Sequence, residues 1–526
     1  MVNPVAPGVA SAPDPAPALL IRLDPRDTVA VTPEDLEAGI RAAVPGESAV
    51  LLAHSVKRGH KVALGAHAAG EPVIKYGHPI GAAIADIAAG DWVHVHNLAS
   101  GISGELDYGQ APASPAILPT PAFPAGLPDH FMGYRREDGL VGIRNQIWII
   151  PTVGCVNGVA DRIAAAGNKA FGHERCGDTA PGAGGLEVLA LTHPYGCSQL
   201  GDDLAHTRRI LASLARHPNA AGVLVLGLGC ENNLIDEFLA EIGERPAGSI
   251  ESIRLQDVDD EVEAAMAALG RLAAYASRFV RERIPASELV IGLKCGGSDG
   301  FSGITANPMV GRISDLAVAA GGSALLTEVP EMFGAEDNLL DRAASPEVWR
   351  STVGMVNHWK AYFLGHGQGS HENPSPGNRE GGITTIEEKS LGCVRKAGST
   401  RVVDIIPYGG RRAQKGLSLV SGPGNDLVSS TALAAAGAQL IIFTTGRGTP
   451  FGSIVPTIKV STTTNLALRK PGWIDWDAGP LLGGTGAGAL AASLWQSVVD
   501  TASGRPTRSE VSGYREIAIF KDGVTL

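Results

Sequence analysis

The chain has 526 residues, too many for one hydrophobic core, so two or three domains are expected. Its net charge of −11 argues against nucleic acid or an acidic membrane as the main partner. No stretch approaches the ~20 apolar residues of a membrane span, and the N-terminus lacks a basic region, so we expect a soluble, cytoplasmic protein. Six cysteines in so long a chain do not make a disulfide framework.

The first 129 residues predict a tail, a small module and a linker. Residues 1–20 are rich in Ala and Pro and predict a flexible tail. Residues 21–98 alternate short strand-like runs with turns, which predicts a β-rich module. His94 and His96 would share one face of a strand there, although a solvated or structural pair is a commoner outcome of this spacing than a ligand pair. Recurrent prolines in residues 99–129 predict a semi-extended linker.

The rest of the chain predicts an α/β body with mainly parallel sheets flanked by helices. We expect two lobes, residues 130–370 and 371–526. Short apolar runs bounded by glycine are typical of buried parallel strands, and helical stretches separate them. The runs are residues 148–154, 188–191, 223–229 and 289–294, with helices expected over 202–216 and 259–283.

A cysteine follows each of these four runs: Cys155, Cys197, Cys230 and Cys295. Ligands of open parallel sheets bind beyond the carboxyl ends of the strands, so we expect the four thiols at one edge of one sheet. A single cysteine usually packs as a small hydrophobe, but four at the same position favour a site.

These cysteines and His193 form the predicted metal region. Thiolates prefer Fe or Zn, whereas carboxylate and imidazole ligands suit Fe(II) or Mn(II). Two arrangements stay open at this point. One is a single Fe(II), or Mn(II), with mixed ligands, and the other is an iron–sulfur cluster held by three cysteines with one open iron.

Long, specific motifs run through the body. They are residues 133–145, 151–158, 195–203, 227–233, 295–299, 302–308, 327–336, 373–378, 444–450 and 518–526. Together they resemble the family of altronate and galactarate dehydratases, and residues 59–61 and 73–77 resemble the SAF domain that such enzymes carry. Residues 197–203 and 230–233 are more similar to the altronate than to the galactarate branch.

The resemblance implies removal of water from D-altronate to give 2-dehydro-3-deoxy-D-gluconate, a step of hexuronate breakdown. It also implies dependence on ferrous iron, which favours the arrangement with a single Fe(II). Galactarate or another aldonate or aldarate is the alternative substrate, and a lyase that expels sulfite is more distant. The implied partner is a small-molecule sugar acid, and the oligomeric state stays open, with a homo-oligomer among the options.

Elimination of water beside a carboxylate requires a Lewis acid, a base and an acid. His60 and Lys389 are the candidate bases. Lys389 lies in a charged run with Glu387 and Glu388 that also fits a solvated helix face. Glu328, in the matching stretch 327–336, is a third catalytic candidate.

The candidate substrate-binding residues carry amide, hydroxyl and guanidinium groups. Amides and hydroxyls suit a polyol chain, and Arg447, after the apolar run 440–443, could bind the carboxylate with two hydrogen bonds. A solvated surface arginine is the alternative. The full set is Ser298, Asp299, Asn373, Ser375, Asn378, Arg447 and Thr449.

The sequence fits two other classes of protein less well. No Gly-x-Gly-x-x-Gly opens a helix after a first strand, and no Walker sequence is present, which argues against a nucleotide enzyme. A non-catalytic iron or redox protein could use the four thiols, but the absence of Cys-x-x-Cys argues against it.

Overall fold

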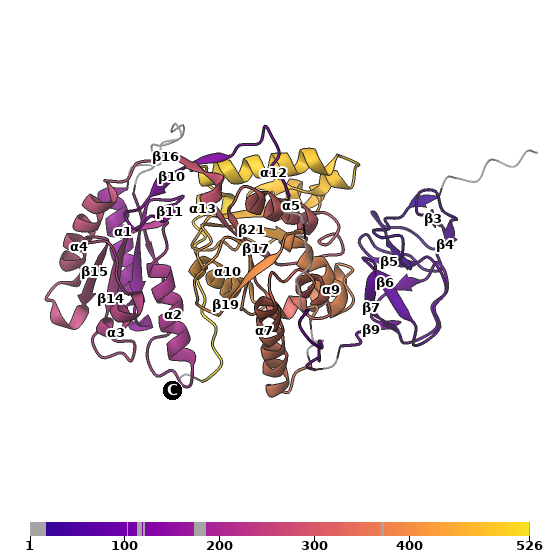
Figure 1. The fold of residues 1–526 in the computed structure, drawn as a ribbon, viewed down its shortest axis with the longest axis horizontal. Helices are drawn as coiled ribbons and strands as arrows, with labels where there is room; N and C mark the ends of the chain where they lie inside the picture. The colour runs from indigo at the N-terminus through magenta and orange to yellow at the C-terminus, as the bar shows by residue number, and fades with distance from the viewer. Residues whose placement is uncertain are drawn as a thin grey trace, which may run out of the picture. The chain divides into compact units, whose positions relative to one another are not determined.

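The computed structural model describes residues 17–102, 104–112, 118, 121–172, 186–369 and 373–524 (Figure 1). The chain forms two compact units, one of Met1–Gly101 with Gly382–Thr385 and one of Ile102–Gly381 with Ile386–Leu526. We call them the N-terminal unit and the large unit. Most of the predicted tail lies outside the described residues.

The N-terminal unit is built from short strands, as predicted. It contains three three-stranded sheets around a core that includes Val29, Val62, Val73 and Ile80. The sheets have the orders β1-β3-β4, β2-β5-β8 and β6-β7-β9. The strands are β1 (Ala18–Leu19), β2 (Val29–Val31), β3 (Arg41–Ala43), β4 (Val50–Leu51), β5 (Lys61–Ala63), β6 (Pro72–Lys75), β7 (His78–Ala83), β8 (Trp92–Val93) and β9 (Leu98–Ala99).

A four-stranded parallel sheet of order β13-β12-β14-β15 forms the first part of the large unit. Its two central strands, β12 and β14, are buried on both faces because helices cover both sides. Helices α1 and α4 pack on the face that carries Ile147 and Leu224, and α2 and α3 pack on the face that carries Trp148 and Val223. The elements are β12 (Gln146–Pro151), α1 (Asn157–Phe171), β13 (Glu187–Ala190), α2 (Asp203–Ala215), β14 (Ala220–Gly227), α3 (Ile235–Ile242), β15 (Ile250–Arg254) and α4 (Glu261–Ala276).

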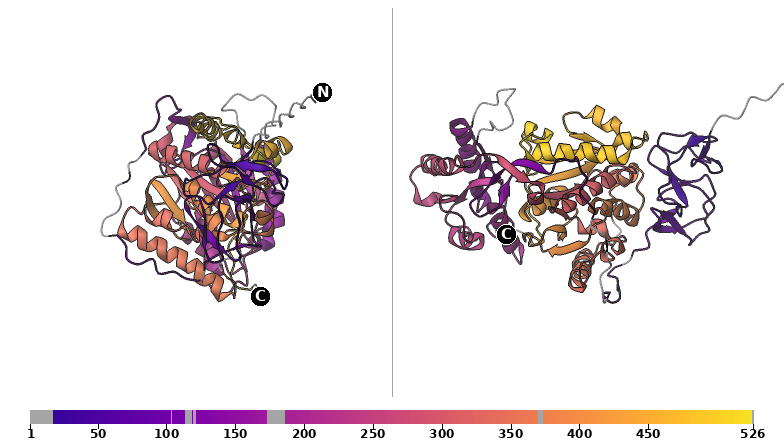
Figure 2. Two further views of the ribbon diagram at one scale, coloured as in Figure 1. Left: turned by 90° about the vertical axis from the view of Figure 1, so that its right-hand side faces the viewer. Right: turned by 45° about the horizontal axis from the view of Figure 1, so that its top comes forward.

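A seven-stranded parallel sheet of order β19-β20-β18-β17-β21-β22-β23 forms the second part. Helices α5 and α12 pack together on one side of it, and α10 lies on the other (Figures 1 and 2). The strands are β17 (Val290–Cys295), β18 (Ser323–Leu326), β19 (Val402–Ile406), β20 (Gly416–Val420), β21 (Leu440–Thr445), β22 (Thr457–Ser461) and β23 (Trp476–Asp477). The helices are α5 (Ala306–Ala319), α6 (Asp337–Leu340), α7 (Pro346–Gly365), α8 (Pro376–Glu380), α9 (Ile386–Cys393), α10 (Asp426–Ala435), α11 (Thr464–Arg469), α12 (Ala487–Ala502) and α13 (Arg508–Ser512).

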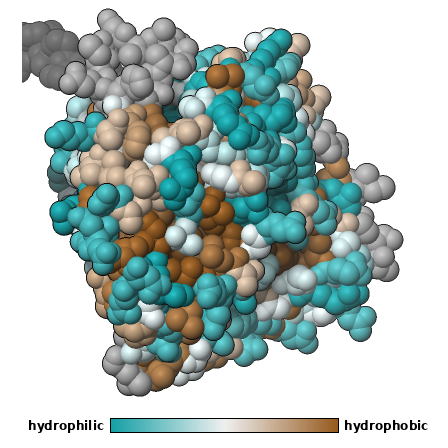
Figure 3. Space-filling model, turned by 90° about the vertical axis from the view of Figure 1, so that its left-hand side faces the viewer, coloured by the Kyte–Doolittle hydropathy of each residue, from teal (hydrophilic) through white to brown (hydrophobic). Residues whose placement is uncertain are grey.

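One hydrophobic core joins the two parallel sheets. Ile210 and Leu214 of α2 lie in the same cluster of buried side chains as Leu433 of α10 and Phe443 of β21. A small antiparallel sheet, with the order β11-β10-β16, is made by β10 (His130–Arg135), β11 (Val141–Gly142) and β16 (Glu282–Pro285). Viewed from the side of the four-stranded sheet, hydrophobic residues gather in the middle of the surface with hydrophilic residues around them (Figure 3).

The boundaries inside the body differ from the prediction. The seven-stranded sheet takes β17 and β18 from before residue 371 and five strands from after it, so no lobe boundary falls there. Part of the predicted linker is also packed, because Tyr108 donates a hydrogen bond to Glu336 (2.9 Å) and accepts one from Lys360 (2.7 Å). In the described part of the chain, no helix combines the length and the apolar character needed to cross a membrane.

Candidate active site

A cluster of charged and thiol side chains lies at the carboxyl edge of the seven-stranded sheet. Strands β17 and β18 are parallel neighbours, so the residues that follow them meet at this edge. Helix α9 and the 3₁₀ turn Val394–Ala397 add further groups from later in the chain. All members are at most 8% exposed: Lys294, Cys295, Glu328, Glu331, Lys389, Cys393 and Lys396.

Two thiols and a carboxylate in this cluster lie close enough together to hold a metal ion. Cys295 Sγ lies 3.4 Å from Cys393 Sγ and 3.4 Å from Glu331 Oε2, to which Cys393 donates a hydrogen bond of 3.0 Å. The three ligand atoms all lie within 4.8 Å of one another. Hydrogen bonding to Cys295 and burial raise the pKa of Cys393, and a bound cation would reverse this by stabilising the thiolate. Two sulfur ligands and one carboxylate are a donor set that could hold a transition-metal ion.

Lysines pair with every carboxylate of the cluster. Lys396 Nζ lies 2.8 Å from both Glu328 Oε2 and Cys295 Sγ. Lys294 also pairs with Glu328, and its Nζ lies 3.0 Å from Asp426 Oδ1. Because an unpaired buried charge is costly, these pairs are what allow the charges to be buried.

Lys389 is the lysine nearest to the predicted substrate turn. Its Nζ lies 2.9 Å from Glu331 Oε1 and donates to Asn373 Oδ1 (2.9 Å) and Asn378 Oδ1 (3.1 Å). Burial alone would lower the pKa of Lys389, but the Glu331 carboxylate raises it above its usual value. Conversely, burial would raise the pKa of Glu331, but the three surrounding lysines lower it. Lys389 is therefore protonated, which suits a proton donor rather than a base.

The backbone at Glu328 is strained in a way that places its carboxylate. Glu328 has φ 70°, in the left-handed region that costs a non-glycine residue of the order of 1–3 kcal/mol. In this conformation Glu328 Oε2 accepts a hydrogen bond from the backbone N–H of Cys295 (3.1 Å) as well as from Lys396. Strain of this kind is concentrated at functional sites.

The other predicted substrate residues lie around the same edge. Asn378 Nδ2 donates to the carbonyl of Ser298 (2.9 Å), and Ser375 caps α8. Asp299 accepts a hydrogen bond from Thr462 (3.0 Å). The carbonyl of Gly297 accepts hydrogen bonds from the backbones of residues 446 and 447, so the loops after β17 and β21 are joined.

Arg447 and Thr449 are not arranged as a free pair of groups for binding a carboxylate. The Arg447 side chain is 43% exposed, with Nη2 2.9 Å from Glu380 Oε2 and Nη1 donating to the Gly377 carbonyl (3.2 Å). A carboxylate ligand would have to replace Glu380. Thr449 Oγ1 accepts from the backbone of Phe451 (3.3 Å).

The four predicted thiols do not share one sheet. Cys155, Cys197 and Cys230 follow β12, β13 and β14 of the four-stranded sheet, whereas Cys295 ends β17 of the seven-stranded sheet. The expectation was wrong because equal runs of buried strand can belong to different sheets. The partner of Cys295 is instead Cys393, at the end of a helix. Cys393 follows Lys389 by four residues, so both lie on one face of helix α9. This spacing is the sequence signal that could have identified Cys393.

The three remaining thiols lie on hydrogen-bonded loops. The carbonyl of Tyr195 accepts from Gly154 (2.8 Å), and Asn232 accepts from the backbone of Ser198 (2.9 Å). Cys155 and Cys230 are exposed, and Cys197 is half-buried.

His193 does not fit the predicted ligand role. Its Nε2 lies 2.8 Å from the carbonyl of Pro151, and Nδ1 accepts from the backbone of Tyr195 (3.2 Å), so both ring nitrogens are occupied. Burial lowers the pKa of His193 to about 4, which keeps the ring neutral. It holds the loop in place.

His60 lies in the N-terminal unit. It is buried, accepts a hydrogen bond from Trp92 Nε1 (3.1 Å), and its ring centroid is 5.1 Å from that of His94. His94 is buried and His96 is exposed, and Trp92 lies against both rings, so the two histidines do not form a ligand pair.

Comparison with known proteins matches three segments that make up most of the chain to one family. Residues 18–101 match the altronate/galactarate dehydratase SAF domain, residues 133–277 the second domain of D-galactarate dehydratase/altronate hydrolase, and residues 286–525 the D-galactarate/altronate dehydratase C-terminal domain. The chain is 47% identical over 511 residues to an altronate dehydratase of Bacillus subtilis, covering 96% of this chain and 99% of that protein. It belongs to the altronate/galactarate dehydratase family. The predicted resemblance is confirmed.

Other members of the family differ in their distance from this chain. An altronate dehydratase of Escherichia coli is 48% identical over 506 residues, covering 96% of this chain and 99% of that protein. A galactarate dehydratase (L-threo-forming) of Escherichia coli is 33% identical over 526 residues, covering 96% of this chain and 97% of that protein. The β subunit of a (2R)-sulfolactate sulfo-lyase from Chromohalobacter salexigens is 32% identical over 401 residues, covering 74% of this chain and 97% of that protein.

Proposed function

We propose that this protein is a hydro-lyase that converts D-altronate into 2-dehydro-3-deoxy-D-gluconate. The observation that carries the proposal is identity of 47% and 48% to two altronate dehydratases over nearly their full lengths, against 33% to a galactarate dehydratase. The buried cluster of lysines, carboxylates and thiols beside an amide-rich turn supports it, because it offers proton donors, acceptors and metal ligands at one edge of a sheet.

The reaction is a proton abstraction coupled to loss of a hydroxyl. A base takes the proton from the carbon next to the carboxylate, and the electron pair forms the carbon–carbon double bond. The hydroxyl on the neighbouring carbon accepts a proton from an acid and leaves as water, and the resulting enol tautomerises to the 2-keto acid. The hydroxyl leaves readily only if it is protonated as it departs.

We assign the proton donation to Lys389 and the proton abstraction to Glu328, with His60 as the alternative base. Lys389 is supported by its raised pKa and by Asn373 and Asn378, whose amide oxygens hold the ammonium. Glu328 is supported by its strained backbone and its position between two lysines. Ser298, Asp299 and Arg447 remain our candidates for binding the sugar acid.

Cys295, Glu331 and Cys393 are the residues that would hold an Fe(II) ion, with Mn(II) as the alternative. When bound, the metal supplies a Lewis acid that polarises a carboxylate or hydroxyl oxygen of the sugar acid. A second arrangement has its own support, since Cys155, Cys197 and Cys230 lie on joined loops at one sheet edge. Three cysteines can hold an iron–sulfur cluster with one open iron.

Anaerobic assays of three proteins would test the proposal and separate the two iron arrangements. Wild type, Cys393→Ser and Cys197→Ser are reconstituted with Fe(II) and thiol and given D-altronate or galactarate, and 2-keto-3-deoxy acid, iron and acid-labile sulfide are measured. We expect turnover of altronate, iron without sulfide, and loss of iron in Cys393→Ser only. Acid-labile sulfide in proportion to iron, with both lost in Cys197→Ser, would instead assign the iron to a cluster held by Cys155, Cys197 and Cys230. If iron-loaded wild type did not turn over altronate, the proposed substrate would be wrong.

A further inference from the structure

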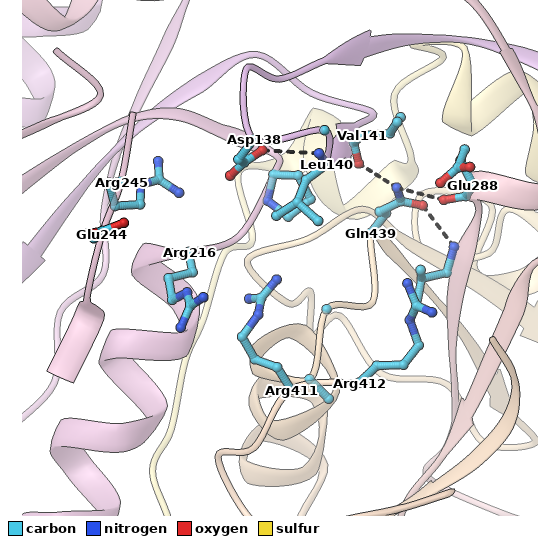
Figure 4. Close-up of a pocket in the computed structure, with 15 residues that line it drawn as sticks. Asp138, Leu140, Val141, Arg216, Glu244, Arg245, Glu288, Arg411, Arg412 and Gln439 are labelled. Atoms are coloured by element: carbon cyan, nitrogen blue, oxygen red, sulfur yellow. Dashed lines mark hydrogen bonds between the residues drawn. The ribbon is translucent and has the colours of Figure 1, made fainter. Parts of the chain in front are cut away.

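A cavity of about 330 Å³ lies in the large unit (Figure 4). The strand ends that line it are opposite to those that carry the candidate active site. Its wall includes Pro218, Val290 and Gln439, which stand at the amino ends of β14, β17 and β21. Val290 begins the strand that ends at Cys295, so roughly 17 Å of β17 separates the cavity from the thiol cluster.

Four arginines line this cavity. Arg216 caps the end of α2, Arg245 follows α3, and Arg411 and Arg412 precede β20. Within the described residues none of the four forms an ion pair with a carboxylate. Figure 4 shows the four arginines around the pocket, with Arg216 and Arg245 on the left and Arg411 and Arg412 at the lower centre and right.

Few of their hydrogen-bonding groups are used. Arg411 Nη1 donates to the carbonyl of Ser213 (2.9 Å), near the end of α2, and Arg412 Nη1 donates to the carbonyl of Gln414 (3.2 Å). Arg245 Nε is buried and has no hydrogen-bond partner. Capping of a helix end therefore explains one bond of Arg411 but not the gathering of four cations.

The acidic groups of the wall leave this charge incompletely balanced. Asp138 attracts Arg245 and Arg411, and Glu288 attracts Arg412, but Glu288 Oε1 also pairs with Lys415 (3.2 Å) and Glu244 is exposed. Burial, followed by repulsion from Arg216 and Arg245, lowers the pKa of Arg411 to about 10. A cavity lined by charges of one sign attracts ions of the opposite sign, here anions.

We propose that this cavity binds a small multivalent oxyanion, with phosphoryl or carboxylate groups, at a site separate from the dehydration site. The planar forks of guanidinium groups bind both oxyanions through paired hydrogen bonds, and the volume suits a small metabolite. Helix α10 connects the two places, because Asp426 at its start pairs with Lys294 and Ala436 after its end lines the cavity.

Calorimetric titration of the full-length protein tests this, with pyrophosphate and citrate as probes for the two kinds of oxyanion. The test protein is a double variant that carries both Arg216→Gln and Arg412→Gln. The matched control is Arg312→Gln, which replaces an exposed arginine on α5. We expect at least one probe to bind wild type and Arg312→Gln equally, and the double variant at least about tenfold more weakly. The probe that binds more tightly identifies the phosphoryl or the carboxylate source.

Three outcomes would overturn the proposal. They are the absence of binding by both probes, equal binding by the double variant, and competitive displacement of the bound probe by D-altronate at concentrations that saturate turnover. The last would make the cavity the substrate site rather than a separate one.

Discussion

At the scale of single residues, the candidate site depends on buried charges that compensate one another. Lys294, Lys389 and Lys396 face Glu328, Glu331 and Asp426, and removal of Lys389 takes away the ion-pair partner of buried Glu331. A hydrophobic core would not need such a set, so the cluster is better explained by chemistry than by stability.

Replacement of Lys389 by Met should abolish most of the activity. The variant lacks the proposed proton donor, so we expect kcat on D-altronate to fall by about 10²–10⁴-fold. Lys169→Met, at an exposed position on α1, is the control and should keep wild-type kcat. Circular dichroism checks that both variants are folded, and a folded Lys389→Met enzyme within threefold of wild type would contradict the assignment.

Gly446 is needed because of the space it leaves for Asp299. A Cβ atom at position 446 would lie 2.4 Å and 2.5 Å from the two carboxylate oxygens of Asp299. Gly446→Ala should therefore displace Asp299 from Thr462 and raise KM for the sugar acid by about tenfold. Gly488→Ala is the matched control, since a Cβ there meets nothing within 4 Å. An unchanged KM in Gly446→Ala would remove Asp299 from the binding site.

At the scale of elements, one buried ion pair fastens the end of the chain to the body. Arg144, just before β12, pairs with Glu510 of α13 (2.8 Å) and donates to the carbonyl of Thr501 at the end of α12 (2.9 Å). Arg144→Met should cost about 3–5 kcal/mol in the free energy of unfolding, because buried Glu510 loses its closest partner and keeps only Arg515, 3.8 Å away. Arg135→Met breaks the exposed pair with Glu282 and should cost less than about 1 kcal/mol. Equal midpoints of urea unfolding would count against this role.

The same pair predicts how stability depends on pH. Burial would raise the pKa of Glu510, but Arg144 lowers it from 4.5 to about 2. A carboxylate with a lowered pKa stabilises the folded state above its unfolded pKa, and this stabilisation, roughly 3 kcal/mol, is lost as pH falls from 4.5 toward 2. Unfolding measured between pH 6 and 3 should show a steeper loss in wild type than in Glu510→Gln, and parallel curves would contradict the prediction.

At the scale of the whole molecule, the two units do not follow the order of the chain. Gly382–Thr385 folds with the N-terminal unit although it lies just before α9, which carries Lys389 and Cys393. Within that unit, buried Lys61 donates to Thr384 Oγ1 (2.7 Å) and to the carbonyl of Gly382 (2.8 Å), and His94 Nδ1 lies 3.0 Å from Thr384 Oγ1.

Thr384→Val should therefore destabilise the N-terminal unit by about 1–3 kcal/mol, because it leaves buried polar groups without their partner. Hydrogen exchange of strands β5 and β8 should become faster, while exchange in the four-stranded sheet stays unchanged. Ser55→Ala, which removes an exposed hydrogen bond to Glu37, should leave exchange in both places unaltered. Protection of β5 equal to that of wild type in Thr384→Val would show that the segment is not part of the unit's stability.

The elements themselves were predictable because local pattern determines them. The apolar runs before Cys155, Cys230 and Cys295 form the buried strands β12, β14 and β17, and the turn-rich segment 21–98 forms short strands. Lys389 and the Asn373–Asn378 turn were also identified in advance and lie together. Such features depend on hydrophobic periodicity and turn residues close in sequence.

The sequence by itself determined the class of fold, the β-rich front module and the family, since these are carried by contiguous motifs and by the alternation of strands and helices. Only the tertiary structure decided which thiols meet. Cys393 reaches Cys295 across 98 positions of sequence, while Cys155, Cys197 and Cys230 stay with another sheet. The physical reason is that sheet membership depends on which strands pair and which helices cover them, and these are contacts between distant segments that no local pattern encodes.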